Sequence, residues 1–248
     1  AAGDRVAAVL TDGGLRVGTR DALVSVPTLP GGDGWLHVAV PARGPTVATT
    51  RRGYVHRVAD DGSTTALGRI QRGALPAAST TGGDVVLATE GGAVYRVVAE
   101  GGSARLVETW PSGAEPASAV GCAHGRVVVA RTTGVVEAGP PEGPSTRWLT
   151  LASPVTALAV GDGFAALGDT RGRVFVVPQD AATAGEPTPP LDAEITALAV
   201  LKEAPGPDDA PLRIVVLEAG RRLRLHRASR AGGVRTHGAP LALEPGAR

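Results

Sequence analysis

The chain has 248 residues, a formal net charge of +1, 43% hydrophobic residues and 20% charged residues, which is ordinary for a globular protein. A charge this close to zero excludes a bulk electrostatic attraction to nucleic acid or to membranes. The single cysteine, Cys122, excludes an internal disulfide and fits a reducing compartment, and no apolar run reaches the roughly 18 residues of a membrane span. We therefore expect a cytoplasmic protein without a membrane span, and leave open secretion after removal of a signal.

From the N-terminus onward, short strands rich in Val, Thr, Ala and Leu alternate with turns that contain glycine. Such segments predict antiparallel strands joined by tight hairpins. The pattern forms outer groups at residues 6–26, 46–67, 84–108, 127–150, 164–177 and 212–236. Residue 1 is not methionine, and we expect a processed chain or a piece of a larger protein.

A further short apolar strand precedes most of these groups. The five candidates are residues 36–40, 75–79, 118–122, 155–160 and 195–200. Two of them, VTALAV from Val155 and ITALAV from Ile195, share five of six residues and start 40 residues apart. A strand pattern that repeats about every 40 residues predicts radial repetition, with small inner strands crowded around an axis.

The segment VTALAVGDGFAALGDTRGRVFVV, residues 155–177, resembles a blade of the WD-repeat family. The layout continues along the whole chain, although no Trp-Asp dipeptide closes a strand and no Gly-His pair opens a repeat. The resemblance implies an all-β fold, a β-propeller of about six four-stranded blades formed as one domain by residues 1–248. A quinoprotein-like or other divergent propeller is an alternative.

The number of blades depends on one missing strand. Six outer groups are present but only five inner strands. Residues 241–244 (LALE) could supply the sixth by pairing with the first group, which would close the ring and cover its open edges. Alternatively, the missing strand or a seventh blade lies upstream.

Candidate catalytic and metal-binding groups lack the required spacing. No two of the five histidines are spaced as metal ligands, and acidic turns such as residues 60–63 lack the alternating ligands of a calcium loop. Asp and Gly are also what hairpin turns prefer. We expect no catalytic site, no cofactor and no metal. The alternatives are a propeller hydrolase or lyase, and a quinoprotein-like small-ligand binder.

The densest basic stretch is residues 221–230, RRLRLHRASR. In a strand, Arg222, Arg224 and His226 share one face and Leu223 and Leu225 the other, so we expect the Arg/His face to be solvated. Nucleic-acid sites combine a wide basic surface with stacking aromatics, and this stretch has none. We expect no nucleic-acid partner, and an acidic partner is the better match.

In a WD-like arrangement, the turns between second and third strands and the loops between blades share one face. Exposed Trp and Arg are frequent anchors of protein interfaces. We predict that the partner-binding residues on this face are Trp35, Arg51, Arg52, Arg69, Arg72, Trp110, Arg131 and Arg171. In the alternative, the tryptophans pack in the core and the charges are ordinary solvated loops.

Two long insertions, residues 178–190 and 201–211, are rich in Pro, Ala and acidic side chains, and we expect flexible surface loops. Together the repeats and the absent catalytic motifs favour a non-catalytic scaffold or sensor. Its partners would be proteins or other domains of the same polypeptide. The family resemblance implies, by analogy, the recognition or regulatory domain of a larger bacterial signalling or defence protein.

Overall fold

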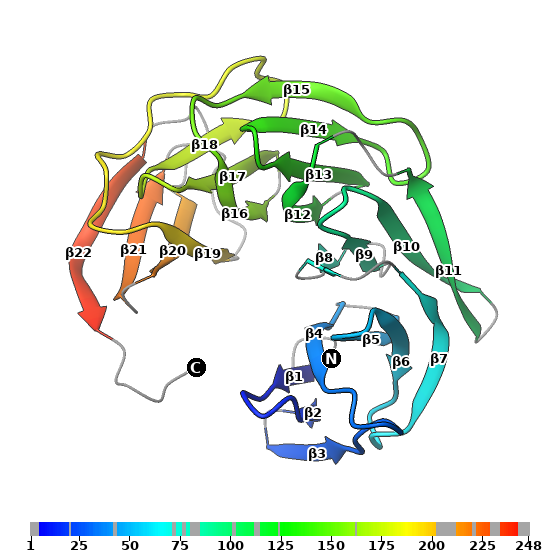
Figure 1. Cartoon of the computed structure of the whole chain (residues 1–248). Helices are drawn as coiled ribbons and strands as arrows, with labels where there is room; N and C mark the ends of the chain where they lie inside the picture. Colours follow the sequence, from blue (N-terminus) through cyan, green and yellow to red (C-terminus); the bar gives the residue numbers. More distant parts are fainter. Residues whose placement is uncertain are drawn as a thin grey trace. The chain divides into compact units, whose positions relative to one another are not determined.

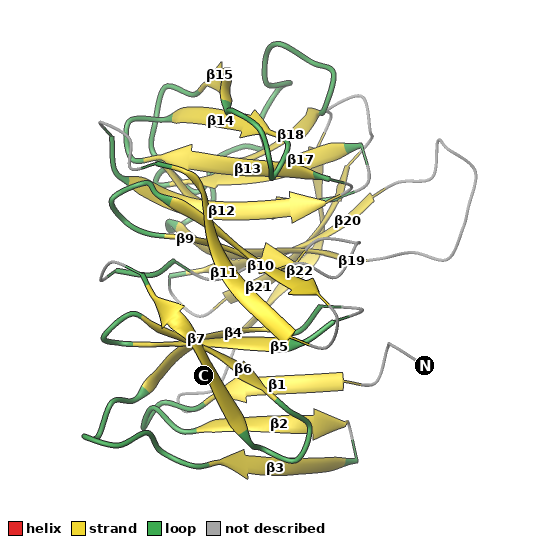
Figure 2. Ribbon diagram, turned by 90° about the vertical axis from the view of Figure 1, so that its right-hand side faces the viewer, coloured by secondary structure: helices red, strands yellow, loops and turns green. Residues whose placement is uncertain are grey.

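A computed structural model describes most of the chain. The described residues are 5–19, 21–41, 44–70, 73–75, 78–79, 85–100, 103–111, 115–123, 125–161, 163–201, 212–219, 222–228 and 234–242. They form 22 strands and no helix (Figure 2). Nothing in this part of the chain has the helical length and apolar character that crossing a membrane requires.

The strands form six antiparallel sheets, which follow one another along the chain (Figure 1). The first three sheets are β1 (Arg5–Val9), β2 (Leu15–Thr19) and β3 (Ala22–Val26); β4 (Trp35–Ala39), β5 (Thr46–Thr50), β6 (Tyr54–Val58) and β7 (Thr64–Arg69); and β8 (Ala78–Ser79), β9 (Val85–Ala88), β10 (Val94–Glu100) and β11 (Ser103–Trp110). The other three are β12 (Ala117–Ala123), β13 (Arg126–Arg131), β14 (Val135–Gly139) and β15 (Thr146–Thr150); β16 (Val155–Val160), β17 (Phe164–Asp169) and β18 (Val174–Pro178); and β19 (Ile195–Leu201), β20 (Leu212–Glu218), β21 (Arg222–Ala228) and β22 (Val234–Ala242).

The contacts divide the chain into two compact units. The first contains residues 1–127, 140–144 and 248, and the second contains residues 128–139 and 145–247. That residues 1–248 form a single domain stays a prediction.

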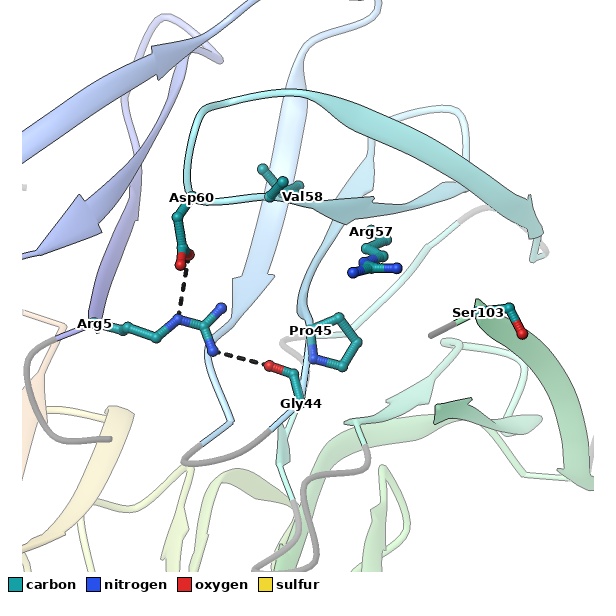
Figure 3. Close-up of a pocket in the computed structure, with 8 residues that line it drawn as sticks. Arg5, Gly44, Pro45, Arg57, Val58, Asp60 and Ser103 are labelled. Atoms are coloured by element: carbon teal, nitrogen blue, oxygen red, sulfur yellow. Dashed lines mark hydrogen bonds and ion pairs between the residues drawn. The ribbon is translucent and has the colours of Figure 1, made fainter. Parts of the chain in front are cut away.

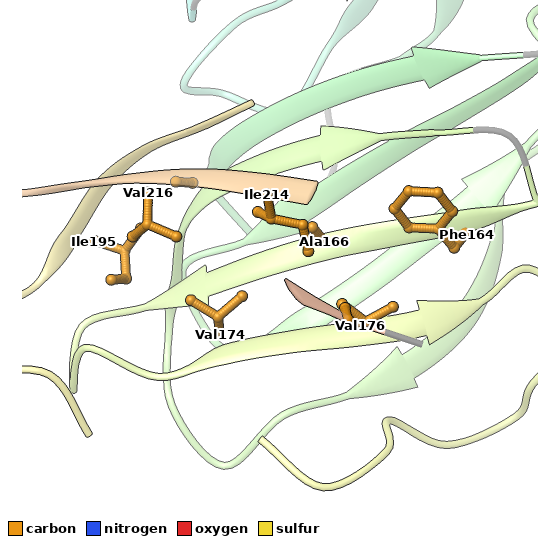
Figure 4. Close-up of a cluster of buried hydrophobic side chains, with 9 residues drawn as sticks. Phe164, Ala166, Val174, Val176, Ile195, Ile214 and Val216 are labelled. Atoms are coloured by element: carbon orange, nitrogen blue, oxygen red, sulfur yellow. The ribbon is translucent and has the colours of Figure 1, made fainter. Parts of the chain in front are cut away.

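Among the described residues, the core clusters lie between two consecutive sheets. In the first unit, Leu15 and Val17 of the first sheet pack with Trp35 and Val58 of the second. In the second unit, Phe164, Val176 and their neighbours on β16–β18 meet the side chains of Ile195, Ile214 and Val216 (Figure 4). A fully buried Val or Ile contributes about 1.5–3 kcal/mol. Strands such as β5, β9 and β17 are buried along their whole length, because their sheets have neighbours on both faces, and this explains why the repeats must stack.

The first sheet has three strands, as the missing inner strand predicted, but residues 241–244 do not complete it. Leu241 and Ala242 belong to β22, where they pair with Leu223 and Arg222 of β21. The prediction of closure by this segment is therefore wrong for these two residues, because their backbone already extends the last sheet. Residues 243 and 244 lie outside the described residues.

The fifth sheet also has three strands, and the proline-rich segment after β18 takes the position beside its edge. The Thr188 N–H donates to the Val174 carbonyl, and the Val174 N–H donates to the Thr188 hydroxyl, each at 2.9 Å. The Trp148 indole N–H donates to the Ala181 carbonyl at 2.7 Å. The expectation of a flexible loop at residues 178–190 is therefore wrong, since these bonds hold the segment against the sheet. In the other insertion, residues 202–211 lie outside the described residues.

The face of β21 predicted to be solvated is exposed at Arg222, but the prediction is wrong for Arg224 and His226. His226 has 0% of its surface exposed. The Arg224 side chain, 15% exposed, pairs with the fully buried carboxylate of Glu218 on β20. This pairing brings a basic side chain into the interior, and it leaves Leu223 and Leu225 on the outward face, half-buried.

Candidate partner surface

Backbone hydrogen bonds join the turn between two strands of one sheet to the loop that enters the next sheet. In the first unit, the Trp35 N–H donates to the Gly13 carbonyl, and the Ile70 N–H to the Gly53 carbonyl, each at 2.9 Å. In the second unit, the Leu191 N–H donates to the Gly172 carbonyl at 3.0 Å. Within each unit, the β1–β2, β5–β6, β13–β14 and β17–β18 turns therefore adjoin the inter-sheet loops, as the predicted arrangement required. We call this side of each unit its turn face.

A side-chain hydrogen bond stabilises several of these turns. The Thr50 hydroxyl accepts from the Tyr54 N–H at 3.1 Å, and the Thr89 hydroxyl from the Ala93 N–H at 3.2 Å. The Asp169 carboxylate accepts from the Arg173 N–H at 2.8 Å. These hydrogen bonds were not predicted, although each of the three acceptors stands three residues before a glycine.

Asp169 has further partners and no exposed surface. Its second carboxylate oxygen accepts from the Ser153 hydroxyl at 2.5 Å and from Arg173 Nε at 2.8 Å. Arg173 Nη2 also donates to the Ser153 hydroxyl at 2.7 Å. Both oxygens of the carboxylate are used inside the turn, so the geometry assigns Asp169 to the structure of the turn face.

Three of the predicted partner residues are buried. Trp35 is 1% exposed and meets the His56 ring edge-on, with centroids 5.4 Å apart. Trp110 is 3% exposed, and its indole N–H donates to the Gly143 carbonyl at 2.8 Å. Arg131 is 5% exposed and pairs with Glu137. The tryptophans therefore take the packing role left open as the alternative, and Arg131 stabilises the β13–β14 turn instead of facing a partner.

Arg69 lies against an exposed tyrosine, Tyr54, which Arg51 and Arg52 precede in the chain. Arg51 and Arg52 form the β5–β6 turn, Tyr54 follows it with 40% of its surface exposed, and Arg69 ends β7. The Arg69 guanidinium lies 5.2 Å from the centre of the Tyr54 ring and donates to the Arg52 carbonyl at 3.3 Å. We call these four residues the basic patch.

The arginines of the basic patch have no carboxylate partner among the described residues, unlike several other arginines of the chain. Arg96, Arg173 and Arg222 each pair with a carboxylate elsewhere on the chain. Within the described residues, by contrast, no carboxylate pairs with any arginine of the basic patch. Three positive charges without a counter-charge repel one another, so an anionic partner is stabilised here.

The two remaining residues of the predicted partner-binding set, Arg171 and Arg72, are not part of the basic patch. Arg171 is exposed on the β17–β18 turn, and its backbone N–H donates to the Asp169 carboxylate at 3.0 Å. Arg72 lies outside the described residues. Tyr54 was not predicted, because a tyrosine that starts a strand gives no sign of its exposure.

A cavity of about 370 Å³ lies in the first unit, on the side where Gly44 and Pro45 enter β5 (Figure 3). Arg5 is its most prominent charged group. It pairs with Asp60 at 3.3 Å and donates to the Gly44 carbonyl at 2.9 Å and to the Thr46 hydroxyl at 2.6 Å. The Arg5 Nε atom has no hydrogen-bond partner apart from this ion pair, and Arg57 also lines the cavity.

Two histidines that the sequence placed in strands have structural partners. His37 Nε2 lies 2.9 Å from the Ala74 carbonyl, and burial lowers its pKa, while that carbonyl acts in the opposite direction. Burial also lowers the pKa of His56, with the nearby Asp33 opposing the shift. Among the described residues, no three His, Cys, Asp or Glu side chains gather as metal ligands.

Comparison with known proteins identifies the fold. Protein-family models and curated protein sequences give no match. Among solved structures, the chain is similar to the WD40 β-propeller domain of Doa1, with a TM-score of 0.73, 13% identity, and 98% of this chain and 81% of that chain covered. It is similar to a chain of the mitotic checkpoint complex, with a TM-score of 0.73, 9% identity, and coverage of 93% and 72%. It is also similar to U3-55K, with a TM-score of 0.72, 13% identity, and coverage of 97% and 79%.

These similarities show a WD40-like β-propeller fold, which confirms the resemblance and the all-β class predicted from the repeats. The identities are too low to transfer a partner or an activity.

Proposed function

We propose that the chain is a non-catalytic protein-interaction module, and that a partner protein binds the basic patch with acidic side chains. The observation that carries this proposal is that none of the three arginines of the basic patch has a carboxylate partner among the described residues. One of the similar structures is a chain of the mitotic checkpoint complex, which also supports an assembly role.

The chemistry of the basic patch suits a protein partner. Arginine and tyrosine are enriched among the residues that dominate interface energetics, since both offer planar contact area together with directional donors. The cation–π contact between Arg69 and Tyr54 holds both side chains in place before binding, which lowers the entropy lost on association. Exposed charges of this kind chiefly raise the association rate, so binding should weaken as salt increases.

The finer assignment is also a proposal: a recognition or regulatory domain of a larger bacterial signalling or defence protein, working in the cytoplasm. It is supported by the lone, buried Cys122 and by the family analogy. Fractionation of the producing cells tests the location, and recovery of the chain in the secreted fraction would contradict it.

Affinity capture with matched variants tests the interaction. The full chain, the R51E/R52E variant and the R16E variant are used as baits, because Arg16 is also exposed but lies in β2, away from the basic patch. We expect the wild type and R16E to retain the same partner and R51E/R52E to lose it. Equal capture by all three baits contradicts the proposed surface.

A further inference from the structure

The cavity beside Arg5 lies at one end of the second sheet, within the first unit. β5 begins there, after Pro45, and β6 ends there, before Ala59. The basic patch lies at the other end of β5, where Arg51 and Arg52 form the turn to β6. The cavity is therefore a separate site, and it does not depend on the partner proposed for the basic patch.

Two arginines reach the cavity from the two faces of the second sheet. Arg57 is directly opposite Val47 of β5, and Val47 packs with Leu87 of the third sheet, so Arg57 lies on the face toward that sheet. Arg5 comes from the other side, because it starts β1 of the first sheet. Figure 3 shows the two guanidinium groups on either side of Pro45.

The charges of the cavity wall do not balance. Among the described residues that line the cavity, Asp60 is the only acidic one, whereas Arg5 and Arg57 are both basic. Asp60 pairs with Arg5, but its side chain is 71% exposed. The contact of 3.3 Å also does not satisfy the buried Arg5 Nε–H as a hydrogen bond.

Arg5 is held in place by other contacts. Its two terminal nitrogens donate to the Gly44 carbonyl at 2.9 Å and to the Thr46 hydroxyl at 2.6 Å. Exposed ion pairs contribute little to stability, because water competes for both charges. The Asp60 carboxylate can therefore turn into solvent while the Arg5 guanidinium stays at the wall, and another anion can take its position.

The size and the remaining wall of the cavity suit a small molecule. Its volume of about 370 Å³ is near the lower end of the roughly 300–1,000 Å³ of small-molecule sites, which combine apolar walls with a few polar groups. Pro45, Val58 and Ala59 supply apolar wall, and the Ser103 side chain at the start of β11 supplies a hydroxyl.

We infer that this cavity binds a small organic anion. Its carboxylate or phosphate group pairs with Arg5 and Arg57, since guanidinium groups donate charge-assisted hydrogen bonds to either kind of oxyanion. Its apolar part lies against Pro45 and Ala59. The bound anion displaces the Asp60 carboxylate from Arg5.

NMR titration of the full, ¹⁵N-labelled chain tests the inference, with the backbone amide signals of residues 59 and 60 as the readout. The probes are phenyl phosphate, benzoate, inorganic phosphate and the uncharged benzyl alcohol. We expect both aromatic anions to bind, and the tighter of the two identifies the preferred charged group. Inorganic phosphate should bind at least about tenfold more weakly than phenyl phosphate, because it lacks an apolar part, and benzyl alcohol should not bind.

Two pairs of matched variants locate the site. R57Q should weaken phenyl phosphate binding about tenfold, whereas R16Q removes an exposed arginine outside the cavity and should leave the affinity unchanged. D60N should strengthen binding about threefold, because it removes the carboxylate that competes for Arg5. D61N removes the same charge one residue later, outside the cavity lining, and should have no such effect. Binding should also persist in R51E/R52E, which separates this site from the basic patch.

Several results overturn the inference. One is that neither aromatic anion shifts the signals of residues 59 and 60, and another is equal affinity in R57Q and the wild type. Benzyl alcohol binding as tightly as benzoate would mean that the arginines contribute nothing. Equal affinity for inorganic and phenyl phosphate would reduce the cavity to an adventitious anion site. Circular dichroism checks that each variant is folded, and the D60N and D61N pair decides the question if R57Q does not fold.

Discussion

His226 lies on β21 without exposed surface, and its pKa falls from 6.5 to about 4. Burial is the largest cause and the charge of Arg224 adds to it, whereas the Glu218 carboxylate acts in the opposite direction. The folded protein therefore keeps this imidazole neutral at a pH where the unfolded chain would protonate it. Acid should consequently favour unfolding, with the loss beginning as the pH falls through about 6.5.

The magnitude follows from the two pKa values. One unit of pKa difference corresponds to about 1.4 kcal/mol, so His226 alone should lower the free energy of unfolding by about 2 kcal/mol between pH 7 and pH 5. The loss should reach about 3 kcal/mol by pH 4, where the folded protein also begins to bind the proton. A total of this size is a substantial part of the stability of a single domain.

Urea denaturation between pH 7 and pH 4 measures this effect in the wild type and in H226Q. Glutamine cannot be protonated, and the carboxylates, His37 and His56 titrate in both proteins. The difference between the two curves therefore isolates His226. We expect the wild type to lose about 2 kcal/mol more than H226Q between pH 7 and pH 5. Parallel curves would refute the argument that burial keeps this imidazole neutral.

Three further substitutions test other parts of the structure by denaturant unfolding. D169A should cost about 3 kcal/mol, because it leaves Arg173 unpaired in the turn; a cost below about 1 kcal/mol would contradict that role. Gly134 and Gly125 both have positive φ, but a Cβ at Gly134 would lie 2.5 Å from the Leu151 carbonyl oxygen, whereas Gly125 has open space. G134A should therefore be more destabilising than G125A by at least about 1 kcal/mol, and equal costs would disprove the close contact. Arg227 of β21 stands directly opposite Arg213 of β20 and Arg235 of β22. R227Q should therefore stabilise the protein by about 0.5 kcal/mol at low salt and less at high salt; a salt-independent effect would mean that charge repulsion is not the cause.

The sequence predicted the fold because the repeated strands carry local signals. Glycine turns and β-branched residues mark each hairpin, and the near identity of the strands that start at Val155 and Ile195 reveals the period. The same signals predicted a first sheet without its inner strand. The prediction that residues 241–242 complete the first sheet was wrong. These residues suit any apolar strand position, and only their pairing with β21 decides where they lie.

Which side chains are buried was harder to predict, because the alternation along a strand separates its two faces without showing which of them is buried. Leu225 and His226 are neighbours on β21, and packing against Ile214 and Glu218 of β20 decides that the histidine is the one inside. Arg131 was assigned to a partner because its pairing with Glu137 was not recognised.

The partner-binding role of the basic patch is tested most directly by the affinity of a purified partner obtained from the capture experiment. Its dissociation constant is measured by isothermal titration calorimetry for the wild type, R51E/R52E and R16E at low and high salt. We predict that R51E/R52E binds at least about tenfold more weakly at low salt and that R16E binds like the wild type. An affinity that R51E/R52E leaves unchanged would contradict the proposal that the partner binds at the basic patch.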